Sequence, residues 1–364
     1  MSDLPFLLAL SFIPNLGPVS ARSLISYCGG TAEAVFSTPK GKLLKVPGIG
    51  ESMAKAVLEQ DTLKKAEKEL SSCEKLGIQV IPYDHPLYPR ELSFIFDAPL
   101  ILYLKGKINL NAQPNIAIVG TRKPTEHGRD ITREFTEFFV GQGINVMSGL
   151  AYGIDITAHK TALDMDGKTT AVLGHGLDSI YPATHAQKAF SIQRKGGLLT
   201  EYPLGVKPDA RHFPARNRIV SGISKAVIVI EAAERGGALI TAHQAFEQNR
   251  EVYAVPGRLG DTYSVGCNNL IKNQVAKLIS HPQEVLDDLE IIWDTKDTQL
   301  DLALETVLSP EETKVMNYLN KGDAAVDHIF HQTGIPMSQL NSLLLSMEFK
   351  GLIAQAPGKK FRKK

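Results

Sequence analysis

The stretch from Arg211 to Thr241 reads RHFPARNRIVSGISKAVIVIEAAERGGALIT, and it contains a wholly apolar strand, Ala226 to Ile230, followed by a glycine-rich turn. In an open parallel sheet, ligands bind beyond the carboxyl ends of the strands. A glycine-rich turn that leads into a helix offers free backbone N–H groups to a phosphate. Opposite charge is supplied by Arg211, Arg216, Arg218 and Arg235. The pattern indicates an anion site, for a small nucleotide or for the backbone of a nucleic acid.

Strands and helices alternate around this stretch. From Asn115 the apolar runs IAIVG, INVMSG, TTAVLG, GGLLTEY, AVIVIE and EVYAVPG follow one another, with helical patterns through Phe135 and Leu163 between the first of them. Near-continuous apolar strands that alternate with helices are typical of parallel sheets covered on both faces. The sequence predicts an α/β fold, with an extended Rossmann-like, doubly wound parallel sheet at residues 96–290.

A smaller helical domain is expected at residues 1–95. It contains two glycine turns, at Ile13–Ala21 and Val46–Ala54. The second, VPGIGESMA, resembles the turn of a helix-hairpin-helix or SAM-like domain, in which backbone amides face a DNA phosphate. A tight turn between two helices with no ligand explains the same residues equally well. Proline-punctuated pieces between residues 80 and 115, such as Leu100 to Leu104, are interpreted as a connector.

A third domain is expected at residues 309–364, after a linker at 291–308. Its first helix has Ser309 as N-cap, Pro310 at the first position and Glu312 at the third. Two amphipathic stretches, Val326–Thr333 and Met337–Phe349, precede a basic end. Three helices and a short wing predict a winged-helix-like domain. Its leucine-rich last helix also fits a protein-interaction or dimer module.

Composition excludes several classes of protein. The 364 residues, 43% of them apolar and 22% charged, can bury a sizeable core, and a net charge of +1 excludes a polycation that binds nucleic acid through its overall charge. Three cysteines, Cys28, Cys73 and Cys267, form no CxxC pair, so neither a disulfide framework nor a metal site is expected. The first residues fit neither a signal peptide nor a membrane span, and we expect a soluble, cytoplasmic protein.

The end of the first strand of the sheet carries Gly120, Thr121 and Arg122. These residues can hold one phosphate through a backbone N–H, a hydroxyl and a bidentate guanidinium. Alternatively, Arg122 pins a neighbouring loop through an ion pair. We single out Arg122 as the strongest candidate for a phosphate ligand.

The second strand ends at Ser148 and Gly149, and the following helix places Asp155 and His159 four residues apart on one face. Such a pair can act as an acid and a base, but no nucleophile or metal partner lies beside it in the sequence. We therefore interpret Asp155 and His159 as structural residues that orient the loop. Ser148 is interpreted as a hydrogen-bond donor, because the G-x-S-x-G elbow of a nucleophile is missing.

Nucleotide cofactors are not expected. The third strand runs into a lone G-x-G, the three-glycine Rossmann fingerprint is missing from the first turn, and no GxxxxGK[ST] loop occurs. Aromatic residues interleaved with the arginines, such as Phe213, instead suit single-stranded nucleic acid, whose bases are free to stack. Tyr181 by itself is predicted to lie in the core.

Seven motifs occur in order along the central domain: GTRKPTEHG, SGLAYGIDITAH, TTAVLGHGLDSIYP, FPARNRIVSG, ERGGALITA, YAVPG and SVGCNNLI. Together they resemble the DNA-processing protein A family (DprA, also called Smf). The resemblance implies a non-catalytic protein without a cofactor that binds and protects single-stranded DNA. It further implies a homodimer that loads the RecA recombinase in natural transformation or related recombination.

Carried over by motif, the resemblance places in the DNA pocket the GTR turn, the run from Arg216 to Arg218 and the turn at Gly236 and Gly237. Two flanking phosphate contacts, Lys188 and Arg211, are added. The family's serine is threonine at Thr121, which keeps a hydroxyl, and alanine at Ala238, which does not. The predicted DNA-binding set is Gly120, Thr121, Arg122, Ser148, Gly149, Lys188, Arg211, Phe213, Arg216, Asn217, Arg218, Gly236 and Gly237.

One enzyme class stays open as an alternative. Sheets with a glycine-pair turn and an RNR segment also resemble the nucleoside-phosphate hydrolases of the lysine-decarboxylase-like group, which cleave an N-glycosidic bond. Those enzymes need a glutamate just after the turn. Here the segment after the turn reads ALITAHQAF, with no acid before Glu247.

Overall fold

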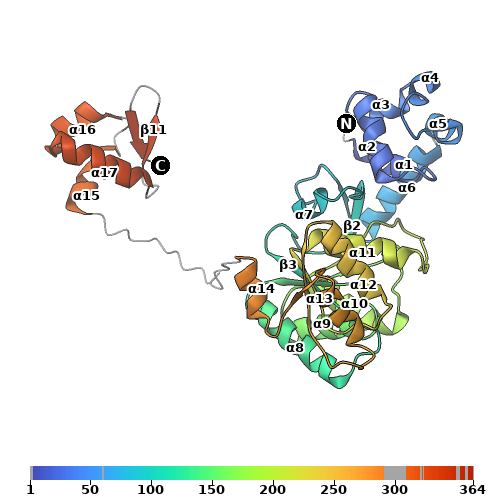
Figure 1. Ribbon diagram of the computed structural model, residues 1–364. Coiled ribbons are helices and arrows are strands. Elements are labelled where there is room, and N and C mark those ends of the chain that lie inside the picture. The colour runs from blue at the N-terminus through green and yellow to red at the C-terminus, as the bar shows by residue number, and fades with distance from the viewer. Residues whose placement is uncertain are drawn as a thin grey trace. The chain divides into compact units, whose positions relative to one another are not determined.

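The computed structural model describes residues 3–59, 61–290, 309–319, 322, 324–349, 353–356 and 360–363. The chain divides into two compact units, Met1–Thr295 and Lys296–Lys364. The predicted linker at 291–308 lies outside the described residues. Each unit is described by itself (Figure 1).

The larger unit is built on a nine-stranded sheet with the order β1-β2-β6-β5-β4-β3-β7-β8-β9. The seven strands β6-β5-β4-β3-β7-β8-β9 are each parallel to their neighbours in this order. By contrast, β1 pairs antiparallel with β2, and β2 pairs antiparallel with β6. All six predicted strands are present, and the predicted Rossmann-like parallel sheet is confirmed. The strands are β1 (Gln79–Pro82), β2 (Ile101–Gly106), β3 (Asn115–Val119), β4 (Asn145–Ser148), β5 (Thr169–Val172), β6 (Gly197–Thr200), β7 (Ala226–Val229), β8 (Glu251–Ala254) and β9 (Lys277–Leu278).

Helices cover both faces of this sheet because successive residues of a strand point to opposite sides. In β3, Ile116 and Ile118 pack with α8, α9 and α14, while Ala117 and Val119 pack with α11, α12 and α13. Such burial on two faces explains why the strands are apolar at nearly every position. The helices are α8 (Glu126–Gly141), α9 (Ile154–Asp164), α10 (Ala186–Lys195), α11 (His212–Ile223), α12 (Gly237–Glu247), α13 (Val265–Lys272) and α14 (Gln283–Asp288).

The region between residues 80 and 115 differs from the prediction of a connector. It forms β1 and β2, which extend the sheet, with the short helix α7 (Arg90–Ser93) between them. The apolar piece Leu100–Leu104 supplies most of β2. Pro82 pairs with Ile101 at the end of β1, a strand at the edge of the sheet, where a proline is tolerated because one side of the strand needs no N–H donor.

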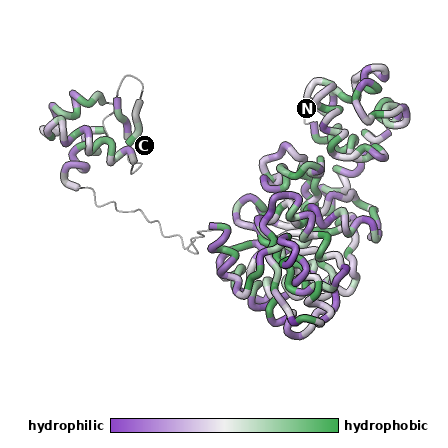
Figure 2. Tube along the Cα trace, viewed as in Figure 1, coloured by the Kyte–Doolittle hydropathy of each residue, from purple (hydrophilic) through white to green (hydrophobic). Residues whose placement is uncertain are grey.

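Within the described part of residues 1–78, six helices precede the sheet: α1 (Leu4–Ser11), α2 (Pro18–Tyr27), α3 (Ala32–Phe36), α4 (Lys40–Leu43), α5 (Glu51–Leu58) and α6 (Asp61–Lys75). Hydrophobic and hydrophilic residues both occur along these helices in Figure 2. Helices α5 and α6 are amphipathic, as expected of helices that cover a core, whereas α1 is apolar at almost every position. Their buried residues form one apolar cluster with Ile101 and Tyr103 of β2. The predicted glycine turn joins α4 to α5, with Gly48 at φ +82°.

The smaller unit contains α15 (Pro310–Leu319), α16 (Val326–Thr333) and α17 (Met337–Phe349), with a three-stranded sheet of β10 (Ala324–Ala325), β12 (Lys360–Lys363) and β11 (Ile353–Ala356) in that order. The last two helices have the predicted bounds. The predicted capping box is present, because the Glu312 N–H donates to Ser309 Oγ at 3.2 Å and the Ser309 N–H donates to Glu312 Oε2 at 2.9 Å.

Candidate nucleic-acid interface

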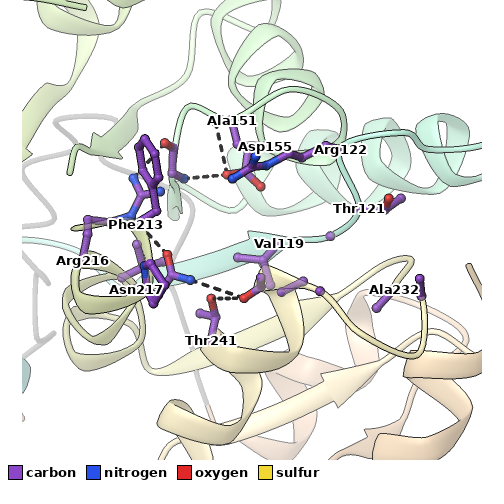
Figure 3. A pocket seen from close by; sticks show the side chains of 18 of the residues that line it. Val119, Thr121, Arg122, Ala151, Asp155, Phe213, Arg216, Asn217, Ala232 and Thr241 are labelled. Carbon is purple, nitrogen blue, oxygen red and sulfur yellow. Dashed lines mark hydrogen bonds between the residues drawn. The ribbon is translucent and has the colours of Figure 1, made fainter. Parts of the chain in front are cut away.

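A cleft of about 710 Å³ opens where the chain reverses direction in the sheet. The chain leaves β3 toward β4 on one side, while β7 leads to β8 on the other, so their carboxyl ends frame a crevice. Figure 3 shows α11 on one wall and the loop after β3 on the other. The predicted residues that line the cleft are Gly120, Thr121, Arg122, Gly149, Asp155, Phe213, Arg216, Asn217, Gly236 and Gly237.

The loop after β3 is held by backbone hydrogen bonds to two neighbouring elements. The Thr121 N–H donates to the Glu231 carbonyl at 2.7 Å, and the Ile154 N–H donates to the Thr121 carbonyl at 3.2 Å. Gly153 permits this approach, since it has φ +80° and a Cβ atom there would overlap the Thr121 carbonyl oxygen. The loop therefore presents the next residue, Arg122, on a fixed backbone.

Arg122 is exposed and extends toward Phe213, with its guanidinium carbon 6.0 Å from the ring centroid (Figure 3). Within the described residues no carboxylate lies at ion-pair distance from Arg122. The same is true of Lys123 and Arg235, which also line the cleft. These three cations give the cleft a positive charge that is not neutralised within the described part of the chain.

Arg216 occupies a different environment, because it is only 5% exposed. Its Nη1 donates to the Gly149 carbonyl at 2.8 Å and also to the Val172 carbonyl. Burial lowers the pKa of Arg216 to about 10, and the nearby Asp155 carboxylate opposes that shift. Arg216 thus connects the ends of β4 and β5 and holds its positive charge below the cleft surface.

Asp155, like Arg216, holds the loop after β4. Its Oδ2 accepts hydrogen bonds from the Gly149 N–H at 3.1 Å and the Ala151 N–H at 3.4 Å. Burial raises the pKa of Asp155, while the Arg216 charge and these donors lower it. The carboxylate is therefore occupied by the loop that it orients.

The third wall is the first turn of α12. Gly236 and Gly237 are exposed, and the first N–H groups of a helix have no partner within the helix. The Asn217 Nδ2 and the Thr241 hydroxyl both donate to the Gly237 carbonyl at 3.3 Å. Since Ala238 has no hydroxyl, the anion donors of this turn are the backbone amides.

Aromatic side chains lie at the rim. Tyr181 stacks on Phe213, with ring centroids 5.7 Å apart and planes 27° apart. Tyr181 is 49% exposed and lines the cleft, so the prediction that it lies in the core is wrong. It lies at the rim because its loop follows β5 across the carboxyl edge of the sheet, where the ring packs on Phe213 of α11 and stays half exposed. This pair offers an aromatic face beside the cations.

Two predicted residues lie beneath the cleft without lining it. Ser148 is fully buried and donates to the Ile118 carbonyl at 2.7 Å. His159 is also buried, with Nδ1 2.7 Å from the Thr169 hydroxyl, and burial lowers the pKa of His159 to about 3. Both side chains connect neighbouring strands and helices of the core.

Three predicted cations do not line the cleft. Arg218 follows Arg216 by two positions on α11, and two residues correspond to a turn of about 200°, so the two side chains point to opposite sides of the helix. Arg218 pairs there with Glu201 at 2.5 Å and with Asp97 at 3.1 Å. Arg211 pairs with its neighbour Asp209 at 2.9 Å. Lys188 lies on α10, which packs against β6.

Several lining or supporting residues were absent from the predicted set. Lys123 could have been found, because it directly follows Arg122. Arg235 was recognised as part of the charge cluster but not as a site residue. Glu231 accepts from the Thr125 N–H at 2.9 Å and the Thr125 hydroxyl at 2.5 Å, which fixes the start of α8. No sequence signal indicates that Tyr263 lines the cleft.

Neither metal-ligand clusters nor membrane spans are found in the residues that the structure describes. No group of three His, Cys, Asp or Glu side chains there could hold a metal ion. None of the described helices is long and apolar enough to cross a membrane.

Comparisons with known proteins agree with this geometry. The family model described as DNA recombination-mediator protein A matches residues 79–290, and the DprA winged helix domain matches residues 302–359, which confirms the predicted winged helix. Protein Smf of Escherichia coli (strain K12) is 39% identical over 305 residues, covering 81% of this chain and 80% of that protein. Protein Smf of Synechocystis sp. is 33% identical over 396 residues, covering 100% and 99%.

Two solved structures are also similar. The X-ray structure of DNA processing protein A from Streptococcus pneumoniae has a TM-score of 0.68 at 32% identity, covering 79% of this chain and 98% of that one. DNA processing protein A from Helicobacter pylori, whose structure is described as giving a single-stranded DNA binding mode, has a TM-score of 0.54 at 28% identity, covering 60% and 97%.

Proposed function

This chain belongs to the DNA recombination-mediator protein A family, and we propose that it binds single-stranded DNA in the cleft between the ends of β3 and β7. One observation carries the proposal: Arg122, Lys123 and Arg235 line the cleft without carboxylate partners among the described residues, beside the exposed glycine turn that begins α12. Cations and backbone N–H groups bind phosphates whatever the base sequence. The structure of the Helicobacter pylori relative supports the same ligand.

Single strands fit this cleft better than duplex. The stacked rings of Tyr181 and Phe213 lie at its rim, and a base must be unstacked and unpaired to lie against such a face. Each base stacked on an aromatic residue contributes about 1–3 kcal/mol to binding. We therefore propose that phosphates bind near Arg122 and the start of α12, with a base against the aromatic pair.

The proposal is for binding rather than catalysis. Asp155 is the carboxylate that lines the cleft among the described residues, and it is buried and occupied by the Gly149 and Ala151 amides. On α12 the first acidic residue is Glu247, at the far end of the helix. An assay for free base released from nucleoside monophosphates tests the hydrolase alternative, and we expect no release.

We also propose the finer roles that the family resemblance implies: protection of the strand, homodimerisation through the Rossmann-like domain, and loading of RecA during transformation or related recombination. Sedimentation tests dimerisation of the full chain. RecA loading is tested by strand exchange on single-stranded DNA coated with a competing single-strand-binding protein. We expect the native chain to restore exchange there, and no stimulation would contradict the loading role.

The central experiment measures binding of a fluorescent single-stranded oligonucleotide over a salt series, with duplex as competitor. We expect log affinity to fall linearly with log salt, by about 0.7 for each phosphate contact. Arg122→Ala should weaken binding and reduce the slope by about one contact.

A matched control is Arg129→Ala, which removes a cation from α8 that already pairs with Glu126 at 3.0 Å. This variant should bind like the native chain. Absence of binding at low salt would contradict the proposal. Equal affinity and slope for Arg122→Ala would remove Arg122 from the phosphate site.

A further inference from the structure

Two phenylalanines after α7 are unusually exposed. Phe94 is 78% exposed and Phe96 is 81% exposed, whereas Ile95 between them is buried. Phe96 helps to form a groove of about 610 Å³ against α2 and the glycine turn before α5. We call this the N-terminal groove, and its lining residues are Val19, Arg22, Ser23, Ser26, Tyr27, Val46, Pro47 and Phe96.

The backbone that carries these rings is held on both sides. Arg22 donates from Nη2 to the Phe96 carbonyl and from Nη1 to the Ala98 carbonyl, both at 2.6 Å. Asp97 pairs with Arg218 of α11 at 3.1 Å. The exposed rings are therefore presented by an anchored turn, which lowers the entropy lost when a ligand binds to them.

The segments around the groove carry unneutralised positive charge. Residues 18–27, 40–51 and 90–98 contain five cations and three carboxylates. Each carboxylate already has a partner: the pairs are Glu51 with Lys40 at 2.5 Å, Glu91 with Arg250 at 2.7 Å and Asp97 with Arg218 at 3.1 Å. Cations without a carboxylate partner among the described residues are Arg22, Lys42, Lys45 and Arg90.

Exposed aromatic faces in a groove lined by Arg22, with Lys42, Lys45 and Arg90 on the segments around it, match a single-stranded nucleic acid, which offers bases for stacking and phosphates for the charges. Duplex offers no free base face. A protein partner that covered these cations would remove them from water, and no carboxylate of this chain among the described residues would offset the free-energy cost.

The cleft and the N-terminal groove are connected through a third, smaller recess that shares one helix with each of them. Helix α11 forms a wall of the cleft with Phe213 and Asn217, and its Ala215 and Arg218 line a recess of about 330 Å³. The other side of that recess includes Pro18 at the start of α2, the helix that lines the N-terminal groove. The recess thus adjoins α11, which lines the cleft, and α2, which lines the groove.

We propose that the N-terminal groove is a second contact for the same single strand, with bases stacked on Phe96 and Tyr27 and phosphates near the unpaired cations. This inference rests on the proposed function of the cleft. It predicts that short oligonucleotides occupy the cleft alone and that longer ones reach both surfaces.

A fluorescence probe reports on the groove directly. Trp293 is the single tryptophan of the sequence, so the full chain with Trp293→Phe and Phe96→Trp carries its only indole at the proposed stacking position. Thymidine oligonucleotides from about 4 to about 30 nucleotides, a range around the sizes of known single-strand sites, are titrated. We expect the long ones to quench Trp fluorescence and the shortest ones to bind without quenching.

Affinity supplies the second measurement. Phe96→Ala should weaken binding of the long oligonucleotide about tenfold and leave the short one unchanged. The matched control is Phe190→Ala on α10, which removes another exposed phenylalanine (59% exposed) and should change neither affinity. Because Phe96 is exposed, circular dichroism should show the native fold in both variants.

The outcomes separate the two sites. In one outcome, short and long oligonucleotides both bind and both depend on Arg122, but neither quenches the indole and Phe96→Ala changes neither affinity. That outcome would overturn the second contact and leave the proposal for the cleft intact. A change in self-association in Phe96→Ala, with unchanged DNA affinity, would show a contact between copies of this chain and also overturn it. Absence of any binding by the native chain would overturn both proposals.

Discussion

The Arg122 guanidinium carbon lies 6.0 Å from the centroid of the Phe213 ring, so the loop after β3 and the first turn of α11 meet across the cleft. A cation near an aromatic face is attracted to it, and the same pair can hold a phosphate and a base of one nucleotide. We therefore expect the two side chains to act together in the proposed binding site.

We predict that Arg122→Ala and Phe213→Ala have different signatures in DNA binding. The first should lower both affinity and salt slope, whereas the second should reduce affinity by about 1–3 kcal/mol with the slope unchanged. A double-mutant cycle should give a coupling of about 0.5–1 kcal/mol. Strict additivity would show that the two side chains act independently.

Arg216→Ala is expected to reduce stability. The change removes donors to the Gly149 and Val172 carbonyls and leaves Asp155 buried without its counter-charge. Breaking a buried pair in this way typically costs about 3–5 kcal/mol. Urea unfolding measures the loss, and Arg122→Ala, which changes an exposed side chain, should show almost none. A stable Arg216→Ala chain that fails to bind DNA would instead identify Arg216 as a phosphate ligand.

Two glycines of the cleft should respond differently to alanine. Gly153→Ala should destabilise the chain by more than about 1 kcal/mol, because φ is +80° and the new Cβ would overlap Thr121. Gly236→Ala should stay within about 0.5 kcal/mol of native, since φ is −177° and nothing lies within 4 Å of its Cβ. Thermal unfolding of both variants provides the comparison, and equal losses would refute the assignment.

Arg218→Ala should make stability more dependent on pH. Burial raises the pKa of Glu201 above its ordinary 4.5, and Arg218 is the main cause that lowers it. Without Arg218 the folded state holds the Glu201 proton more tightly than the unfolded state does. The contribution of Glu201 to the stability of Arg218→Ala should therefore be retained below about pH 4.5 and should be lost as pH rises through the raised pKa of Glu201.

The measurement for Arg218 is urea unfolding at about pH 5 and about pH 8, with a deficit of about 3–5 kcal/mol at the higher pH and a smaller one at the lower. The double variant with Glu201→Gln should lose this difference. Equal deficits at both pH values would mean that Glu201 does not titrate as described.

His159 predicts the opposite pH dependence. Its folded-state pKa is lowered from 6.5 to about 3 by burial, so the unfolded state binds a proton more readily. Its contribution to stability is present above pH 6.5 and is lost, by up to about 1.4 kcal/mol per pH unit, as pH falls toward 3. In urea unfolding, His159→Gln should reduce the loss of unfolding free energy between pH 6.5 and pH 3. The control is His243→Gln, which changes an exposed residue of α12 and should keep the pH dependence of the native chain.

The local features of this protein were predictable from its sequence. Runs such as Ala226–Val229 are apolar at every position because both of their faces are buried, and that pattern alone predicted the parallel strands. Capping residues such as Ser309, and amphipathic patterns such as those of α16 and α17, depend on neighbours within a few residues, so their helices were also predictable. The motif residues Gly120 to Arg122 were correctly expected at the end of a strand.

Tertiary structure decided which of these side chains share a surface. Arg216 and Arg218 look equivalent in the sequence, yet helix α11 turns Arg216 toward Gly149 and Val172 in the wall of the cleft. It turns Arg218 toward Asp97 and Glu201. Likewise the Tyr181 ring packs on Phe213 of α11 and stays 49% exposed at the rim. Direction on a helix and burial in a core depend on contacts between segments far apart in the chain, and residue type and spacing alone do not contain those contacts.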